Sequence, residues 1–209
     1  TQYDKDEKAT PTEEESMLLQ AQETPYYSLD GVKVGSKAEK EIMDCLLTHK
    51  INGEPIVVKY EPDVGGFKPD FQLLQYDVFL EHWAITKDGE VPKWFNQSTE
   101  EYRKSMDFKK NWFGEHKKTL VETFAYEYNP ESPEEFAELL IERIQRTLEE
   151  KFPGKAFKFS TKTYEEIIEL VWQSQKTPVE DIQNFITIAK VYGMSPDDVA
   201  ERMGSGGWT

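Results

Sequence analysis

Cysteine and histidine are scarce in this sequence, and their scarcity excludes several kinds of protein. The chain of 209 residues has a single cysteine, Cys45, so it cannot hold an internal disulfide framework. Only three histidines, His49, His82 and His116, remain as nitrogen ligands. We therefore expect neither a structural zinc cluster nor a disulfide-stapled secreted scaffold.

Long apolar runs are also missing. No segment approaches the ~20 residues needed to cross a bilayer, and the N-terminus has no signal-peptide pattern. There is no internal repeat, and no glycine-rich phosphate-binding motif that would support ATP hydrolysis. These absences predict a soluble intracellular protein, cytoplasmic or nucleoid-associated, without an ATPase motif.

Positive charge is in short supply overall but is concentrated locally. The formal net charge of −15 argues against a general nucleic-acid coat protein. Residues 1–27 are acidic and lack apolar periodicity, which predicts a flexible arm. Between residues 103 and 118 the balance turns basic, so an anion could be accepted there; the basic residues are Arg103, Lys104, Lys109, Lys110, Lys117 and Lys118.

Regular patterns predict an α/β domain over residues 28–130. A helix is expected at 36–49 after the N-cap Ser36, and another at 99–118 with Ser98 and Glu101 in capping-box spacing. Strand-like runs occupy 55–61, 69–75, 77–85 and 119–128, the second and third joined by a tight hairpin. The order is αβββαβ.

The pattern changes after residue 130. Pro133 follows a Ser132 cap, and an apolar stripe runs through Phe136, Leu140, Ile144 and Leu148. We expect an all-helical region over 131–203, with two or three further helices among the segments 163–175, 177–193 and 195–203, and a flexible tail at 204–209.

Two carboxylates interrupt the apolar strands. Asp70 follows Pro69 at a strand start, and strand alternation places Glu81 on one face with Phe79 and Trp83. The hairpin should bring both acids to the same end of the sheet, where a hard divalent ion could bridge them. Such an ion activates water and neutralises charge on a phosphoryl group. The alternative is a strand-start residue and a solvent-facing edge carboxylate.

Two further residues could join this pair. Glu39 shares a helix face with Ile42 and Leu46, although it is equally placed to be the capping-box partner of Ser36. Lys109 lies in an apolar helix stripe with Met106 and Phe113, so it must either extend to the surface or meet a carboxylate.

This order of elements, with acids at these places, resembles the PD-(D/E)xK nuclease superfamily. More narrowly, the chain is similar to the nuclease-like segment of helicase-IV-type members of the UvrD/Rep superfamily 1 DNA helicases, over about residues 28–200. The resemblance is carried, in this order, by the segments "LDGVKVGSKAEKEI", "VKYE", "FKPDF", "VFLEHWAI", "EYRKSMDFKKNWFGEH" and "TLVETFAYEY", and later by "IQNFITIAK".

The resemblance implies a restriction-endonuclease-like core with a Mg²⁺ or Mn²⁺ ion held by Asp70 and Glu81. The backbone carbonyl of His82 would be a further ligand, and Glu39 would act directly or through water. The family's usual lysine, two residues after the second acid, is replaced by Trp83. Lys109 is the best substitute for it, and the His82 side chain should point to the opposite face and pack there.

The same resemblance implies DNA as substrate and helicase motor domains as partners, in DNA repair or processing. His116 and Glu122 match the narrower pattern, and DNA contacts are expected from Lys104, Lys110, His116 and Lys117. The expected function is a metal-dependent DNA nuclease. The alternatives are a module that binds and positions DNA without efficient chemistry, and a protein-interaction platform. The aromatic side chains Trp83, Trp94, Phe95, Phe108, Phe113 and Phe124 are expected to pack in the core rather than to stack on bases.

Overall fold

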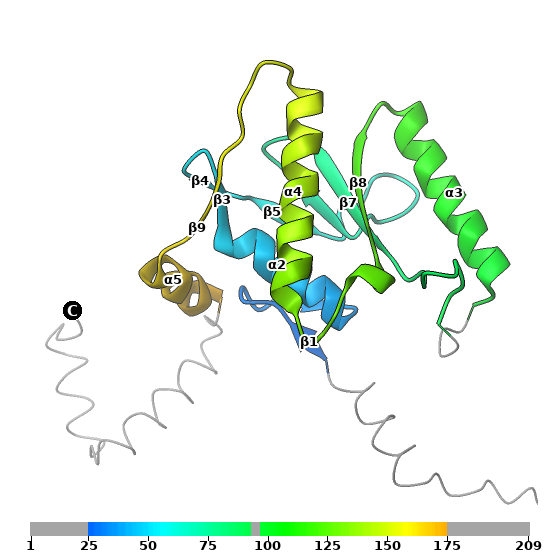
Figure 1. Cartoon of the computed structure of the whole chain (residues 1–209), viewed down its shortest axis with the longest axis horizontal. Coiled ribbons are helices and arrows are strands. Elements are labelled where there is room, and N and C mark those ends of the chain that lie inside the picture. Colours follow the sequence, from blue (N-terminus) through cyan, green and yellow to red (C-terminus); the bar gives the residue numbers. More distant parts are fainter. Residues whose placement is uncertain (1–24, 93–96, 175–209) are drawn as a thin grey trace, which may run out of the picture.

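The computed structural model describes residues 25–92 and 97–174, which form an α/β fold around a mixed four-stranded sheet (Figure 1). The arm and the tail lie almost wholly outside these ranges, as do Trp94, Phe95 and the two helices expected after residue 176. Within them, no helix is long and apolar enough to cross a membrane.

The chain enters the fold through a small ribbon and a capped helix. Strands β1 (Tyr26–Tyr27) and β2 (Lys33–Val34) pair antiparallel, and α2 (Lys37–Thr48) follows. The side chain of Ser36 accepts a hydrogen bond from the Glu39 N–H at 3.1 Å, as its N-cap spacing predicts.

The central sheet has the strand order β5-β6-β7-β8. Strands β5 (Val58–Tyr60), β6 (Phe71–Leu73) and β7 (Val78–Trp83) are antiparallel neighbours, and the short β6–β7 connection confirms the predicted hairpin. Helix α3 (Thr99–Glu115) carries the predicted capping box and returns the chain to β8 (Thr119–Phe124), which pairs parallel with β7. A 3₁₀ turn, η1 (Ala125–Glu127), ends this strand.

Alternation along β7 divides its side chains between two faces of the sheet. Leu80 and His82 face the side covered by α2 and α4, where the His82 ring packs on Phe136. Phe79 and Trp83 face α3, where they meet Phe113 and Met106 respectively. Glu81 lies between them on the α3 face. Helix α3 stands apart from α2 and α4 in Figure 1, beside β8.

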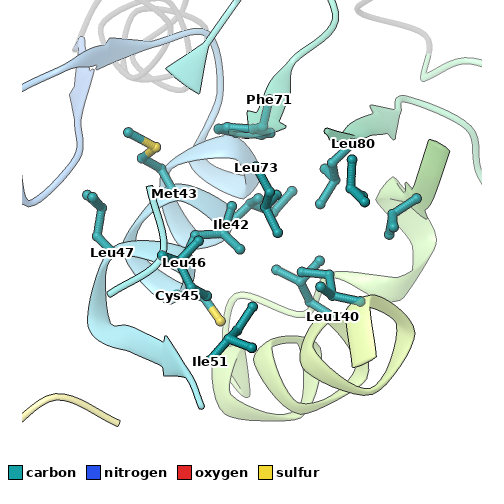
Figure 2. Close-up of a cluster of buried hydrophobic side chains, with 14 of the residues drawn as sticks. Ile42, Met43, Cys45, Leu46, Leu47, Ile51, Phe71, Leu73, Leu80 and Leu140 are labelled. Atoms are coloured by element: carbon teal, nitrogen blue, oxygen red, sulfur yellow. The ribbon is translucent and has the colours of Figure 1, made fainter. Parts of the chain in front are cut away.

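The hydrophobic core continues past residue 130. Helix α4 (Pro133–Lys151) buries Phe136, Leu140, Ile144 and Leu148 in the same cluster as α2 and the sheet. Figure 2 shows Leu140 facing Ile42 and Leu46 of α2 and Leu73 of β6. The expected boundary near residue 130 is therefore not an edge of the core, because the apolar stripe of α4 is covered by the sheet and α2.

The region after residue 130 is not all helical, contrary to expectation. Strand β9 (Phe159–Thr161) pairs antiparallel with β3 (His49–Ile51), which also pairs with β4 (Glu54–Pro55). Helix α5 (Tyr164–Ser174) then follows, as predicted. The turn between β3 and β4 contains Asn52 and Gly53, both at positive φ. An Asn-Gly pair favours a hairpin, so this strand pair had a recognisable sequence pattern.

Candidate metal and nucleic-acid site

Asp70 and Glu81 meet where strand β6 begins. Phe71 pairs with Leu80 across the antiparallel ladder, so Asp70, one residue earlier, comes next to Glu81. The Oδ2 atom of Asp70 accepts a hydrogen bond from the backbone N–H of His82 at 2.6 Å. The hairpin register therefore places the two carboxylates at the same end of the sheet.

Glu81 is a buried carboxylate, and only one of its two oxygens has a hydrogen-bond partner among the described residues. The residue is 1% exposed, and its Oε2 accepts a hydrogen bond from Lys109 Nζ at 2.8 Å. Its Oε1 atom has no hydrogen-bond partner among the described residues. Burial raises the pKa of Glu81 to about 7, although the Lys109 ammonium acts in the opposite direction.

Asp70 titrates under the influence of Glu81. Its carboxyl group lies among protein atoms, and this loss of solvent holds its pKa well above the usual range. The charge of Glu81 raises the pKa further, whereas the His82 N–H hydrogen bond lowers it. Two adjacent carboxyls that resist ionising together are the groups that a divalent cation would stabilise in the charged form.

Lys109 does not extend to the surface. Its place in the α3 stripe between Met106 and Phe113 aims the side chain at the sheet, and only 20% of that side chain is exposed. The Nζ atom lies 5.6 Å from the ring centre of Phe67 and 5.5 Å from that of Trp83. Of the two outcomes left open by the sequence, the structure therefore shows the second: Lys109 meets the carboxylate of Glu81.

Trp83 lies two residues after Glu81 on the same face of β7. It is 2% exposed, and its indole Nε1 donates to Glu122 Oε2 at 2.7 Å. The same oxygen lies 2.6 Å from Lys110 Nζ, whose ammonium is 5.6 Å from the Trp83 ring. Glu122 therefore ties the indole to α3, and Trp83 packs between Glu122 and Lys109.

The carboxylate of Glu39 is bound by groups around the start of α2, although not by the Ser36 N–H that a capping box requires. Its carboxylate accepts hydrogen bonds from Tyr60 Oη at 2.7 Å, from Ser36 Oγ at 2.9 Å and from Gly35 N at 3.1 Å. Its charge still raises the pKa values of Asp70 and Glu81. Over residues 25–92 and 97–174, however, no three acids, histidines or cysteines are grouped so that they could hold a metal. Glu39 is thus a neighbour of the pair and not a third member of a preformed ligand cluster.

The His82 side chain points away from the carboxylates, as expected. Its Nδ1 atom lies 2.9 Å from Thr123 Oγ1, and burial lowers the pKa of the imidazole to about 4. The ring is therefore neutral and packs behind the site, whereas only the main chain of His82 reaches the Asp70 side.

The residues expected to contact DNA lie along α3 and at its end. Lys104 is exposed but pairs with Glu100 at 2.7 Å, and Lys110 pairs with Glu122. His116 caps the helix and stacks on Trp112, with ring centres 4.1 Å apart, and Lys117 follows it in an exposed left-handed conformation. Phe108 departs from the expected packing role, because 56% of it is exposed.

Sequence reasoning missed two residues that shape the site. Tyr60 donates to Glu39, and Phe67 packs against the Lys109 ammonium. Phe67 stands in the loop between β5 and β6, where no periodicity operates; its place three residues before Asp70 was the available indication.

No family model matches the chain, and no curated protein or solved structure matches it significantly. The function is therefore inferred from the geometry of the Asp70, Glu81 and Lys109 group.

Proposed function

We propose that this chain carries a Mg²⁺- or Mn²⁺-dependent deoxyribonuclease domain with a restriction-endonuclease-like core, of the type associated with superfamily 1 DNA helicases. The observation that supports it best is the buried pair of Asp70 and Glu81 with Lys109 Nζ at 2.8 Å from Glu81. Carboxylates at adjacent strand ends with one inward lysine suit hydrolysis of a phosphodiester bond.

The carboxylates of Asp70 and Glu81 fit the divalent ion that this hydrolysis requires. Glu81 Oε1 is buried without a hydrogen-bond partner in the described ranges. The His82 N–H binds Oδ2 of Asp70, so Oδ1 is the oxygen that Asp70 could offer to an ion. These two oxygens would hold the ion, with the carbonyl of His82 as a further ligand, and Glu39 would contribute at most through water. When bound, the ion would supply Lewis acidity and an activated water.

The protein groups have separate roles in this proposal. Asp70 is oriented by the His82 N–H, and Glu81 is oriented by Lys109. The Lys109 ammonium, held among Glu81, Phe67 and Trp83, would offset charge that develops on the scissile phosphate. Its role would be that of an electrostatic and hydrogen-bonding group, since its Nζ donates to Glu81 Oε2.

A second function has two observations in its favour. Trp83 stands where the family's lysine would be, and Lys109 is tied to Glu81 by an ion pair. A module that binds and positions DNA for a helicase, without efficient cleavage, would be compatible with both facts.

A nuclease assay on single-stranded, duplex and forked DNA separates the two functions. The unmodified chain is expected to cleave with Mg²⁺ or Mn²⁺ and not with EDTA, and Asp70→Asn is expected to be inactive. Asp88→Asn, at an exposed turn outside the site, is the matched control and should remain active. DNA binding without cleavage under any metal would reject the nuclease in favour of the positioning module.

A further inference from the structure

A group of aromatic rings lies at the surface beside the candidate site. It consists of Phe67 from the β5–β6 loop and Phe108, Trp112 and His116 from α3, and is called the aromatic platform below. Phe67 meets Trp112 edge to face at 5.2 Å and Phe108 at 6.0 Å between ring centres. The platform is built on a rigid helix and held by Phe113 beneath, which is 2% exposed.

The platform leaves aromatic area in water. Phe108 is 56% exposed and His116 is also exposed, although the core of the fold is nearby. Apolar side chains that are grouped at the surface, unlike single exposed ones, are typical of a contact site. Phe108 packs against one ring of the platform, Phe67, and leaves the rest of its surface open to such a contact.

The platform adjoins the catalytic group directly. Lys109 Nζ lies 5.6 Å from the Phe67 ring centre and 2.8 Å from Glu81 Oε2, so one ammonium connects the rings to the carboxylates. Phe108 precedes Lys109 in the chain, and Phe67 comes three residues before Asp70. A strand whose phosphate reached Lys109 would thus have its next bases over the rings.

The nearby charges and open space favour a nucleic acid over an apolar protein segment. Lys68, next to Phe67, has a side chain that is 60% exposed, with Glu61 no closer than 3.9 Å. The loop before it carries Gly65 and Gly66, where an added Cβ would meet no atom within 4 Å, so a sugar–phosphate backbone has room to approach. Glu61 and Asp63 of the loop and Asp107 and Glu115 of α3 are acids close in sequence to these rings, and they limit the basic character of the surface.

We propose that the aromatic platform binds unpaired bases of single-stranded DNA by stacking. The substrate of the proposed nuclease would then be single-stranded DNA or a frayed end, and this second statement rests on the proposed function. Bases inside a duplex are stacked on one another and would not be available to Phe108. Proteins that bind single strands without sequence preference use this combination of rings and nearby positive charge.

The test is fluorescence anisotropy of a labelled fifteen-nucleotide oligothymidylate, and of a blunt duplex of the same length, in EDTA. Phe108→Ala is expected to weaken oligothymidylate binding about tenfold, within the range for loss of one base–aromatic stack, and to leave duplex binding within twofold. Phe108→Trp should bind like the unmodified chain, whereas Phe108→Leu should lose affinity like Phe108→Ala. Tyr164→Ala, which removes a ring that is 74% exposed on α5, is the matched control and should change nothing.

Several results would overturn the platform. They are an absence of oligothymidylate binding by the unmodified chain, equal losses for single strand and duplex, full binding by Phe108→Leu, and an equal loss in Tyr164→Ala. Full binding by Phe108→Leu would show that the strand does not stack on the Phe108 ring. Because EDTA prevents cleavage, the binding assay tests the aromatic platform independently of the proposed nuclease activity. Strand binding without cleavage under any metal removes the nuclease and keeps the platform, whereas cleavage with unaffected binding in Phe108→Ala does the reverse.

Discussion

Lys109 neutralises one oxygen of Glu81 and leaves the other without a partner in the described part of the chain. Oε2 lies 2.8 Å from the ammonium, whereas Oε1 is buried and accepts no hydrogen bond. A buried carboxylate oxygen in this state carries a desolvation cost. This desolvation cost occurs at a position where Asp70 adds a second carboxyl group.

The first prediction concerns pH and stability. The pKa of Glu81 is about 7 in the folded chain against 4.5 for the ordinary group, so the folded state retains a proton that the unfolded state loses. The free energy of unfolding should therefore fall as pH rises from about 4.5 to 7, by on the order of 3 kcal/mol at ~1.4 kcal/mol per unit. Asp70, with its raised pKa, acts in the same direction. Glu81→Gln should remove the Glu81 contribution, as measured by urea unfolding at pH 5 and pH 8 in EDTA.

The pH prediction has a control variant and a second measurement with Mg²⁺. Glu150→Gln, at an exposed site of α4, should keep the full pH dependence of the unmodified chain. Mg²⁺ should raise the melting temperature at pH 8, above the pKa of Glu81, more than at pH 5. An equal Mg²⁺ effect at both pH values, or one that survives Glu81→Gln, would contradict a site on this pair.

The second prediction separates metal binding from cleavage. Lys109→Ala should keep Mn²⁺ binding, measured by calorimetry, because it removes no oxygen ligand. Its cleavage rate should fall about a hundredfold or more, as for the loss of a charge-stabilising group. Asp70→Asn should lose both. Lys87→Ala, an exposed lysine outside the site, provides the control. Loss of Mn²⁺ binding in Lys109→Ala would show that the lysine maintains the shape of the ion site instead.

Capping residues, strand alternation and helix periodicity predicted several features of the site from the sequence alone. The N-cap Ser36 marked the start of α2, and the capping box of Ser98 and Glu101 marked that of α3. Alternation on β7 placed Glu81 and Trp83 on one face, which is the α3 face. The helix stripe aimed Lys109 inward. Each of these depends on backbone periodicity within one element, which the sequence states directly.

The remaining features depend on contacts between distant segments. Sequence spacing left two roles open for Glu39, at the helix start or beside the carboxylate pair. The hydrogen bond from the hydroxyl of Tyr60, twenty-one positions away, holds its carboxylate at the helix start. Phe108 lies in an aromatic-rich helix, but whether it is covered depends on the path of the β5–β6 loop. Strand β9 is three residues long and pairs with β3 more than a hundred positions earlier, so no local pattern marks it.

The third prediction tests whether α4 belongs to the fold of the site. Leu140 is fully buried against α2 and the sheet, so Leu140→Ala should cost about 2–5 kcal/mol of unfolding free energy. Leu74→Ala, at a residue 46% exposed, should cost much less in the same urea titration. A chain ending at residue 130 should fail to unfold cooperatively, since it would expose the apolar face that α4 covers. Cooperative unfolding of that shorter chain would restore the boundary predicted from sequence.

The last prediction concerns Trp83. The indole of Trp83 is 2% exposed, packs on Ile85 and Met106, and donates to Glu122, with two ammonium groups within 5.6 Å of its ring. Trp83→Phe keeps most of this packing and should cost about 1–2 kcal/mol of unfolding free energy. Trp83→Lys leaves a cavity and adds a third positive charge to a buried region, so it should cost at least ~3 kcal/mol.

The cost of Trp83→Lys should fall when Lys109 is also replaced, because the two ammonium groups then no longer repel each other. The double variant Trp83→Lys/Lys109→Met should thus be less destabilised than the sum of the two single changes, which a double-mutant cycle in urea measures directly. Additive losses would mean that position 83 and Lys109 do not share one electrostatic environment. In that case Lys109 could not stand in for a lysine on the strand, and the module that positions DNA without cutting it would become the better account of the chain.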